Sequence, residues 1–271
     1  MVVPGVYDVL SAKIAERARF SSVVLTGYGV AAGYLGEPDF GLLTQTETLD
    51  VARRVTAAVR IAVVVDADTG YGGPLNVQRM VRDLVRSGAR GIILEDQRWP
   101  KRCGHMRDKE VIDAEEHAAK IRAAQEARGD APFLITARTD ALGTHGLDEA
   151  IRRARLYKGS GADVLFVEGP RTREELRRIG RELPGPLAVN LIEGGRTPFC
   201  SLEELCDMGF FSVGFVLSGL YAAARALQQT YAEIREKGTT AGLGDKLMSF
   251  DEFNTLVGLE ERYAEDERYR A

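Results

Sequence analysis

One short loop holds the densest group of reactive side chains in the sequence. Four side chains that can donate, accept or stabilise a proton stand within five residues, namely Lys101, Arg102, Cys103 and His105. A thiol flanked by cations and an imidazole loses its proton near neutral pH, so the loop predicts an accessible thiolate at Cys103. The alternative, a small apolar core residue, suits Cys200 and Cys206 better, and Cys206 lies within an apolar helical face. We therefore expect Cys103 to be alkylated before the other two cysteines.

Carboxylates gather after two apolar segments. Asp66 and Asp68 stand two residues apart at the end of segment 61–65. In extended backbone their side chains point the same way, and they repel each other unless a cation lies between them. With Glu95, which follows the next apolar segment, they form an all-oxygen set suited to Mg²⁺ or Mn²⁺ rather than Zn²⁺. The pair alone favours two solvated carboxylates at a strand end, whereas Glu95 beside it favours a metal site.

Arg138 ends another apolar segment, where a buried cation needs an anionic partner. A substrate carboxylate is one candidate, and Glu95 and Glu168 are the candidates within the protein. His105 is the histidine near these residues, whereas His117 is expected on a helix surface. Further apolar segments also end in polar or small residues, which are Thr26, Gly27, Tyr28 and Asn190.

Side chains that follow separate segments meet only in a fold that gathers the ends of those segments. Eight short apolar segments alternate with amphipathic stretches, and the predicted strands are 2–4, 22–26, 61–65, 91–94, 133–137, 164–167, 187–189 and 211–214. Helices are expected between them over about 8–18, 45–58, 75–88, 111–127, 147–159, 171–181 and 201–208, with another after residue 217. The alternation predicts a parallel sheet, and eight units close as a (β/α)₈ barrel with its active site at the carboxyl ends of the strands. An open doubly wound sheet is the alternative, although no Gly-x-Gly-x-x-Gly follows the first strand.

Length and composition argue against several classes of protein. The chain has 271 residues, a net charge of −4 and a pI near 5.6, so we expect no binding to nucleic acid through overall charge. No apolar run approaches the roughly 18 residues of a membrane span, and three cysteines favour a reducing cytoplasm over a disulfide framework.

A Gly/Thr-rich stretch predicts two parts: a barrel over 1–236 and a helical extension over 237–271, whose apolar face packs on the barrel or on another subunit.

Several segments closely resemble the isocitrate lyase/phosphoenolpyruvate mutase superfamily, in the branch of methylisocitrate lyase and 2,3-dimethylmalate lyase. WPKRCGH resembles the signature cysteine loop of that family, and VVVDADTGYG resembles its metal-binding strand. LTGYGVAAGYLGEPD is similar to the segment that binds substrate carboxylates, and ITARTDA, VEGP and VNLIEGGRTP are similar to later strand ends. The resemblance runs from about residue 3 to residue 259, although the leading helix usual in the family has no counterpart before the first strand.

The resemblance implies a (β/α)₈ barrel whose last helix is exchanged between subunits, usually in a homotetramer built as a dimer of dimers. It also implies Mg²⁺ held mainly by Asp66 and Asp68, with Glu95 and Asp39 acting through water. It places six residues around the substrate carboxylates, namely Thr26, Gly27, Tyr28, Gly104, Arg138 and Asn190. The implied reaction is retro-aldol-like cleavage of a carbon–carbon bond in a 2-hydroxy di- or tricarboxylate.

Such a cleavage leaves an enolate, whose charge the metal and Arg138 can stabilise. Cys103, as a thiol, can then supply the proton as general acid. Lys101, His105 and Glu168 complete the candidate catalytic set. The sequence assigns no residue as the base that takes the proton of the substrate hydroxyl.

One departure from the family narrows the expected substrate. Tyr221 stands where methylisocitrate lyases carry an arginine that grips a further carboxylate, so we expect a lyase for a small substituted malate. Methylisocitrate lyase is an alternative, and so is a phosphonomutase or other P–C bond enzyme similar to carboxyphosphonoenolpyruvate mutase, although the Cys-Gly-His loop argues against the latter. A catalytically silent barrel that binds a dicarboxylate is a third hypothesis, because fold does not determine function.

Overall fold

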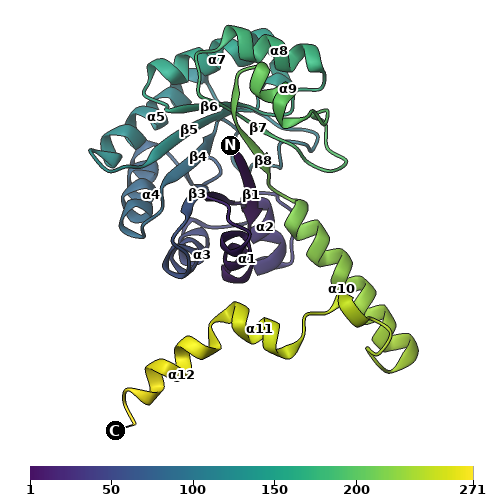
Figure 1. Cartoon of the computed structure of the whole chain (residues 1–271). Helices are drawn as coiled ribbons and strands as arrows, with labels where there is room; N and C mark the ends of the chain where they lie inside the picture. The colour runs from purple at the N-terminus through teal and green to yellow at the C-terminus, as the bar shows by residue number, and fades with distance from the viewer. Residues whose placement is uncertain (271) are drawn as a thin grey trace. The chain divides into compact units, whose positions relative to one another are not determined.

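Eight parallel strands form a closed barrel in the computed structural model, which describes residues 1–270 (Figure 1). The strands are β1 (Val2–Val6), β2 (Ser22–Leu25), β3 (Ala62–Asp66), β4 (Gly91–Glu95), β5 (Leu134–Thr139), β6 (Val164–Val167), β7 (Leu187–Asn190) and β8 (Phe210–Phe215). Each strand pairs with its sequence neighbours, and β8 closes on β1 by pairing Val213 with Val2. The predicted (β/α)₈ barrel is confirmed, each predicted strand overlaps an observed one, and closure excludes the open sheet.

Helices between the strands surround the barrel, and most begin where a local sequence signal places them. They are α1 (Val9–Arg17), α3 (Gln45–Ala58), α4 (Pro74–Arg86), α5 (Ala114–Arg128), α7 (Leu147–Gly159), α8 (Arg173–Glu182) and α9 (Leu202–Asp207). The side chains of Asp8, Thr44 and Ser201 each accept a hydrogen bond from a backbone N–H in the first turn, which would otherwise lack a partner.

Two short helical segments directly after strand ends escaped prediction. One is α2 (Gly27–Val30), which continues as a π-helix over Ala31–Leu35, and the other is α6 (Ala141–His145). Segments of four or five residues are too short to show a helical period in the sequence. Both follow strands whose ends carry candidate site residues, so they turn the chain away at the rim of the barrel.

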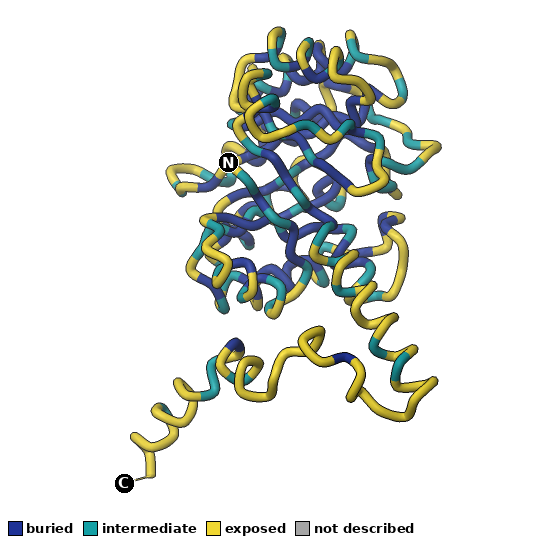
Figure 2. The backbone as a smooth tube through the Cα atoms, turned by 45° about the vertical axis from the view of Figure 1, so that its right-hand side comes forward, coloured by how far each residue is buried: buried dark blue, intermediate teal, exposed yellow. Residues whose placement is uncertain are grey.

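Apolar side chains of the strands and helices form one packed core. Leu25, Val65, Ile92, Ile135 and Leu165 are each at most 1% exposed, and buried residues concentrate in the interior of the first unit (Figure 2). Strands that are covered on both faces form nearly continuous apolar runs, which is why periodicity and β-branched composition were enough to predict them. Polar residues begin where these runs end, so the packed core holds the strand ends as the rigid rim of a site.

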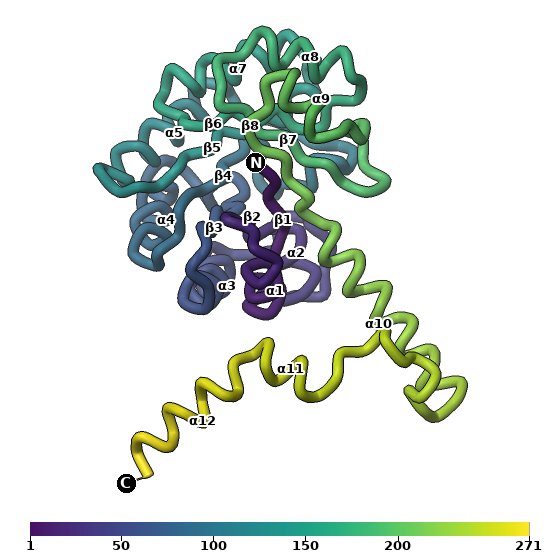
Figure 3. Tube along the Cα trace, viewed as in Figure 1, coloured from purple at the N-terminus to yellow at the C-terminus, as the bar shows by residue number. Residues whose placement is uncertain are grey.

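The chain divides into two compact units, Met1–Ser218 and the part from Gly219 onward. This boundary lies earlier than the expected one after residue 236, because α10 (Ser218–Lys237) falls almost entirely in the second unit. The second unit, drawn in green to yellow in Figure 3, also contains a 3₁₀ turn (Gly244–Lys246), α11 (Phe250–Val257) and α12 (Leu259–Glu267). Several of its large apolar side chains are exposed, among them Leu227, Tyr231, Phe250 and Tyr263.

None of the helices within residues 1–270 is both long enough and apolar enough to cross a membrane.

Candidate active site

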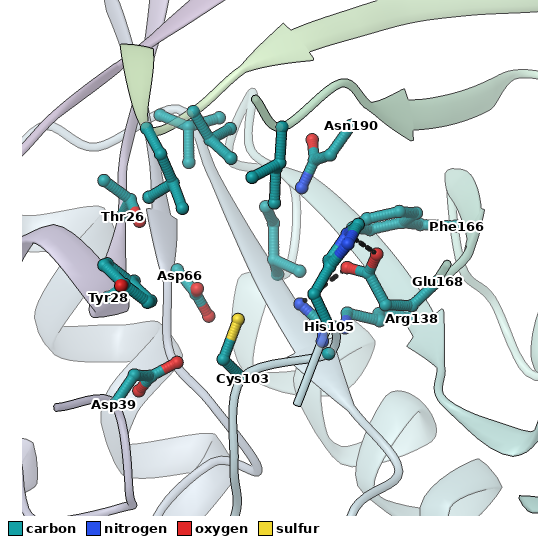
Figure 4. Close-up of a pocket in the computed structure, with 16 residues that line it drawn as sticks. Thr26, Tyr28, Asp39, Asp66, Cys103, His105, Arg138, Phe166, Glu168 and Asn190 are labelled. Atoms are coloured by element: carbon teal, nitrogen blue, oxygen red, sulfur yellow. Dashed lines mark ion pairs between the residues drawn. The ribbon is translucent and has the colours of Figure 1, made fainter. Parts of the chain in front are cut away.

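A cavity opens at the carboxyl ends of the strands, and most of the candidate residues line it (Figure 4). Those lining it are Thr26, Tyr28, Asp39, Asp66, Cys103, Gly104, His105, Arg138, Glu168 and Asn190. The other four candidates are buried but do not line it, and they are Gly27, Asp68, Glu95 and Lys101. The rest of the wall is apolar and consists of Val24, Ile93, Phe166, Ile192, Val216 and Leu217. The strand ends therefore converge as expected, while the roles of their residues stay predictions.

Arg138 is the charged centre of one wall. The strand register sets Glu95 of β4 and Phe166 of β6 beside it. Its guanidinium lies 2.9 Å from Asp140 Oδ2, 3.3 Å from Glu95 Oε2 and 3.1 Å from Glu168 Oε2. Burial by itself lowers the pKa of Arg138, but the three carboxylates outweigh it and hold that pKa well above its usual value. Arg138 therefore stays charged at the edge of the cavity.

His105 is oriented by contacts at both ring nitrogens. Its Nδ1 accepts a 2.8 Å hydrogen bond from the backbone N–H of Arg196, and its Nε2 lies 3.1 Å from Glu168 Oε1. Because Nδ1 is an acceptor, we assign the proton of the neutral ring to Nε2, on the side of Glu168. Burial by itself raises the pKa of Glu168, but Arg138 and His105 together lower it below the usual value. Glu168 is thus a carboxylate that fixes His105 relative to Arg138.

Cys103 lies between Asp66 on one side and the group of Arg138, Glu168 and His105 on the other (Figure 4). Burial raises the pKa of the Cys103 thiol to about 11, and the nearby carboxylate of Asp39 adds to the shift. The thiol therefore stays protonated near neutral pH, as a general acid must.

The prediction of a thiolate at Cys103 is wrong, because its flanking cations turn to other partners. The ammonium of Lys101 lies 2.6 Å from Asp39 Oδ1 and 2.7 Å from Asp68 Oδ1. The Arg102 guanidinium lies 5.3 Å from the ring centroid of the exposed residue Phe40. Adjacency in the sequence therefore did not bring either positive charge to the sulfur.

Asp66 and Asp68 are brought together by a turn. Asp66 is the last residue of β3, and Asp68 has a φ of +50°, a conformation uncommon in residues other than glycine. The backbone N–H of Asp68 donates a 3.1 Å hydrogen bond to Asp66 Oδ1. A β-carbon added at Gly27 would lie 3.0 Å from Asp68 Oδ1 and 3.3 Å from Asp66 Oδ2. The extended backbone assumed from the sequence is wrong, but both carboxylates still reach the same place.

The acidic wall holds more negative charge than its cations neutralise. Burial raises the pKa of Asp68 to about 7, even though the Lys101 ammonium opposes the shift. Burial likewise raises the pKa of Glu95 well above its usual value, against the effect of Arg138. Glu95 Oε1 is buried and has no hydrogen-bond partner. Two of the carboxylates therefore tend to hold a proton unless a further cation is present.

These oxygens fit Mg²⁺ in donor type and in charge. Hard divalent cations prefer carboxylate oxygens, and such an ion would offset the excess negative charge at Asp66 and Asp68. Within the described residues, no three acidic, histidine or cysteine side chains are grouped closely enough to hold an ion as they stand. The Lys101 ammonium provides the positive charge between Asp39 and Asp68 instead.

Sequence reasoning missed the part played by Lys109 and Asp140. Asp140 holds Arg138 in place, and Lys109 Nζ lies 2.6 Å from Asp140 Oδ1. The Lys109 side chain is 3% exposed. A lysine in a polar loop carries no sequence signal of burial, because only the folding of the loop back onto the barrel brings it to a carboxylate.

Two expectations outside the cavity are also wrong. His117 is fully buried, since α5 packs against both α4 and α7, and its ring lies edge-on to Tyr157 with centroids 4.6 Å apart. Cys206 is exposed, because the short helix α9 buries only Leu205. Tyr221 lies on α10 in the second unit, so its effect on substrate size stays a prediction.

Residues 1–235 match the family model described as phosphoenolpyruvate phosphomutase. The chain is 50% identical to the petal death protein of Dianthus caryophyllus, over 100% of this chain and 85% of the relative. It is 48% identical to the chloroplastic carboxyvinyl-carboxyphosphonate phosphorylmutase of Arabidopsis thaliana, over 99% and 80% of the two chains. It is 43% identical to the 2,3-dimethylmalate lyase of Eubacterium barkeri, over 96% and 90%.

Solved structures resemble the chain along its whole length. A 2,3-dimethylmalate lyase superposes with a TM-score of 0.94 at 36% identity, covering 100% of this chain and 91% of the other. Oxaloacetate acetylhydrolase in complex with 3,3-difluorooxalacetate gives 0.93 at 36% identity, covering 99% and 91%. Phosphonopyruvate hydrolase in complex with oxalate and Mg²⁺ gives 0.90 at 29% identity, covering 100% and 94%. With its closed barrel and its cysteine loop, this chain belongs to the phosphoenolpyruvate mutase/isocitrate lyase superfamily, as an enzyme of its lyase and mutase group.

Proposed function

We propose that this protein is a Mg²⁺-dependent carbon–carbon lyase that cleaves a small 2-hydroxydicarboxylate of the substituted malate type. The observation that carries the proposal is the position of the Cys103 thiol on the cavity wall between Asp66 and Arg138, where burial raises its pKa to about 11. Retro-aldol cleavage leaves an enolate that needs a proton on carbon, and a neutral thiol can supply it. An intramolecular mutase reaction delivers no net proton, so the thiol favours a lyase.

Arg138 and the polar strand ends orient the substrate in this proposal. The guanidinium faces a substrate carboxylate, and the Thr26 hydroxyl and the Asn190 amide line the same cavity as further donors. Held by Asp66 and Asp68, with Glu95 and Asp39 nearby, Mg²⁺ would supply electrostatic stabilisation of the oxygen that becomes negative.

Cys103 completes the reaction. The bond beside the hydroxyl-bearing carbon breaks, the hydroxyl proton passes to a base, and a 2-oxo acid forms. The bonding electrons move to the carbon beside the second carboxylate, where the Cys103 S–H delivers its proton, and solvent then reprotonates the sulfur. His105 and Glu168 hold the wall opposite Asp66 in a fixed arrangement during this transfer.

The lining of the cavity supports a substrate with two carboxylates and an alkyl substituent. Among the described residues that line it, Arg138 is the one permanently charged cation, so a third carboxylate finds no second guanidinium or ammonium. Ile192, Val216 and Leu217 form an apolar cluster with Val24, and all four line the cavity. Apolar surface of this kind favours a methyl or ethyl group over a hydrogen-bonding one.

A turnover screen tests the proposal. The purified protein is assayed with Mg²⁺ and with EDTA for release of a 2-oxo acid from 2,3-dimethylmalate and methylisocitrate, of oxalate from oxaloacetate, and of phosphoenolpyruvate or phosphate from phosphonopyruvate. We expect turnover of 2,3-dimethylmalate that EDTA abolishes and excess Mg²⁺ restores, and negligible turnover of methylisocitrate. Faster turnover of phosphonopyruvate or of methylisocitrate would overturn the proposed substrate class.

Ligand-dependent melting gives a test of the metal residues that does not require turnover. Mg²⁺ with oxalate, an enolate mimic, should raise the melting temperature of the wild type, because a ligand that binds only the folded state stabilises it. Asp68→Ala should remove that rise. A rise that persists in this variant or in EDTA would place the ligand elsewhere.

We also propose that the protein is a homotetramer, built as a dimer of dimers with an exchanged C-terminal helix, in the cytoplasm. The exposed apolar side chains of the second unit, such as Tyr231 and Phe250, support assembly. The three free cysteines suit a reducing compartment. Light scattering after size exclusion tests the assembly, and a monomer at micromolar concentration would contradict it.

A further inference from the structure

Lys109 presents a feature that the mechanism above does not use. Its side chain is 3% exposed, and its ammonium lies 2.6 Å from Asp140 Oδ1 and donates a 2.5 Å hydrogen bond to the carbonyl oxygen of Gly104. Taking an ammonium out of water costs free energy that only well-placed anionic and polar partners offset. The ammonium of Lys109 therefore holds both the Asp140 carboxylate and the Gly104 carbonyl in place.

Each partner of Lys109 is directly linked to a residue of the proposed mechanism, which is Arg138 for Asp140 and Cys103 for Gly104. Asp140 accepts hydrogen bonds from Arg138 at 2.9 and 3.2 Å, so its carboxylate is shared between Arg138 and Lys109. Gly104 is the residue between Cys103 and His105 in the chain. One ammonium therefore connects the wall that holds the guanidinium with the loop that holds the thiol.

The backbone at Gly104 packs closely on the side chains of Arg138 and Glu168. A β-carbon at this position would overlap the side chains of Arg138 and Glu168, so the backbone of the loop packs directly on that ion pair. Such a close approach is available to glycine alone. A small shift of the Gly104 carbonyl would move the neighbouring Cys103 sulfur relative to Arg138.

The two sides of the cysteine loop are anchored by different residues. Before Cys103, the Gln97 side chain donates to Arg102 O at 2.8 Å and accepts from Arg102 N at 3.1 Å. After it, Arg196 holds the ring of His105, and Lys109 holds Gly104. Among these anchors, Lys109 is the one that also contacts a carboxylate bound to Arg138.

We propose that Lys109 is a positioning residue that fixes the Cys103 thiol relative to the Arg138 guanidinium, by tying the Gly104 carbonyl and the Asp140 carboxylate to one ammonium. The catalytic consequence rests on the proposed lyase function, whereas the placement of the thiol does not. The alternative is an ion pair that stabilises the fold and leaves the geometry of the thiol unchanged.

The experiment compares three variants with the wild type. Lys109→Met removes the ammonium, and Lys109→Arg keeps a cation that can reach both partners. Lys158→Met is the matched control, because Lys158 is a partly buried lysine on α7 whose ammonium donates to a backbone carbonyl, Asp163 O, at 3.0 Å, outside the cavity. Two quantities are measured: kcat with 2,3-dimethylmalate, and the rate at which iodoacetamide modifies Cys103 relative to Cys206 in the same molecule.

We expect Lys109→Met to lower kcat by about 100-fold, the order of effect of a displacement near 1 Å at a reacting group. Its Cys103 should be modified several times faster relative to Cys206, because the loop no longer holds the thiol against the wall. Lys109→Arg should restore most of both quantities, and Lys158→Met should match the wild type in both. Melting temperatures of all variants are recorded to compare their stability.

Three results would overturn the proposal. The first is an unchanged rate of Cys103 modification in Lys109→Met, and the second is an equal rise in Lys158→Met. The third is a failure of Lys109→Arg to restore the slow rate. If Lys109→Met does not fold, Lys109→Gln replaces it with the same expected changes, because its shorter, uncharged side chain no longer ties Gly104 O and Asp140 to one ammonium. The alkylation rate needs no substrate, so a wild type without lyase activity would contradict the proposed function while the positioning of Cys103 is still decided.

Discussion

Two buried polar clusters lie back to back at the ends of β4 and β5, and they differ in how completely their polar atoms are satisfied. The inner cluster contains Glu95 and Arg138 and borders the cavity. The outer cluster contains Asp96 and Thr139, the next residues along the chain, and contacts α7. Successive side chains of a strand point to opposite faces, so one residue step separates the two environments.

Both oxygens of the Asp96 carboxylate, at the centre of the outer cluster, have hydrogen-bond partners. Asp96 accepts bonds from the hydroxyls of Thr139 and Tyr157 at 2.7 and 2.8 Å, from Arg153 at 3.1 Å and from the Asp140 N–H at 2.9 Å. Buried polar groups with every partner in place hold a unique arrangement. This cluster therefore holds the loop after β5, and with it Asp140, in a fixed place.

The inner cluster leaves acceptors unused. Glu95 Oε1 has no hydrogen-bond partner, and Glu168 Oε1 has only the 3.1 Å contact with His105, made outside hydrogen-bond geometry. Buried groups without partners cost free energy, and these two belong to the candidate site, where the proposed substrate and Mg²⁺ would supply the missing partners. One pair of strands therefore carries a hydrogen-bonded structural contact on its outer face, while its inner face borders the candidate active site.

The largest expected effect is the loss of turnover when Cys103, on the cavity side, is replaced. Cys103→Ser should lower kcat by about 10²–10⁴-fold, the usual contribution of a general acid, because a hydroxyl holds its proton more tightly than a thiol does. Its melting temperature should stay within a few degrees of that of the wild type. Steady-state kinetics with 2,3-dimethylmalate measure the loss, and near-normal turnover would remove Cys103 from the mechanism.

The order of cysteine labelling tests whether the Cys103 thiol is buried and protonated. Cys206 is exposed, whereas burial raises the pKa of Cys103 to about 11. Iodoacetamide should therefore modify Cys206 before Cys103, the reverse of the order expected from the sequence. Peptide mass spectrometry after timed quenching gives the order, and prior modification of Cys103 would show that the loop exposes a thiolate.

A matched pair of substitutions tests the comparison directly. Asp96→Asn should lower the free energy of unfolding by about 1–3 kcal/mol, because the amide leaves at least one of the buried donors that now bond the carboxylate without an acceptor, while Arg153 keeps its contact with Glu149. Glu95→Gln makes the same chemical change on the inner face, where the pKa of Glu95 is already raised. It should change stability by less than about 1 kcal/mol and should lower kcat. Urea unfolding and kinetics on both variants decide the point, and equal destabilisation would abolish the distinction.

Lowering the pH should reduce the free energy of unfolding through His117, which lies beside Tyr157 of the outer cluster. Burial, with Lys120 and Arg153 nearby, lowers the pKa of His117 to about 3, whereas an unfolded histidine has a pKa of about 6.5. Between these values the unfolded chain binds a proton that the folded chain does not. The stabilisation is thus complete above pH 6.5 and is lost progressively as the pH falls toward 3. At pH 4.5 the free energy of unfolding has fallen by about 2–3 kcal/mol from this source.

Substitution separates this contribution from that of other groups. His117→Gln should flatten the dependence of the unfolding free energy on pH between 6.5 and 4.5, because glutamine does not titrate. His145→Gln is the control, since His145 is exposed and should leave the slope unchanged. Urea titrations at both pH values measure the slopes, and equal slopes for wild type and His117→Gln would exclude His117 as their source.

The smallest expected effect is a change in substrate preference when Val216, in the apolar part of the cavity, is replaced. Val216→Thr keeps the branched shape but places a hydroxyl in the apolar wall. The ratio of kcat/KM for 2,3-dimethylmalate over that for malate should fall about 10-fold, within the range for one methyl group in a pocket. An unchanged ratio would show that the alkyl group binds elsewhere.

The sequence by itself determined the barrel and the set of side chains at its rim. Buried parallel strands such as β4 and β6 need continuous apolar runs, and these are visible one strand at a time. Once eight such runs are present, the end of each strand must lie on the same rim, so the meeting of Asp66, Arg138 and Glu168 follows from topology.

Only the tertiary structure decided what each of these side chains touches. Lys101 and Cys103 are two residues apart, yet the ammonium pairs with Asp39 and Asp68 while burial keeps the thiol protonated. Lys109 meets Asp140 because the loop folds back over the barrel, across a separation of 31 residues. Burial and charge pairing depend on the surroundings in all three dimensions, and no local pattern in the chain records them.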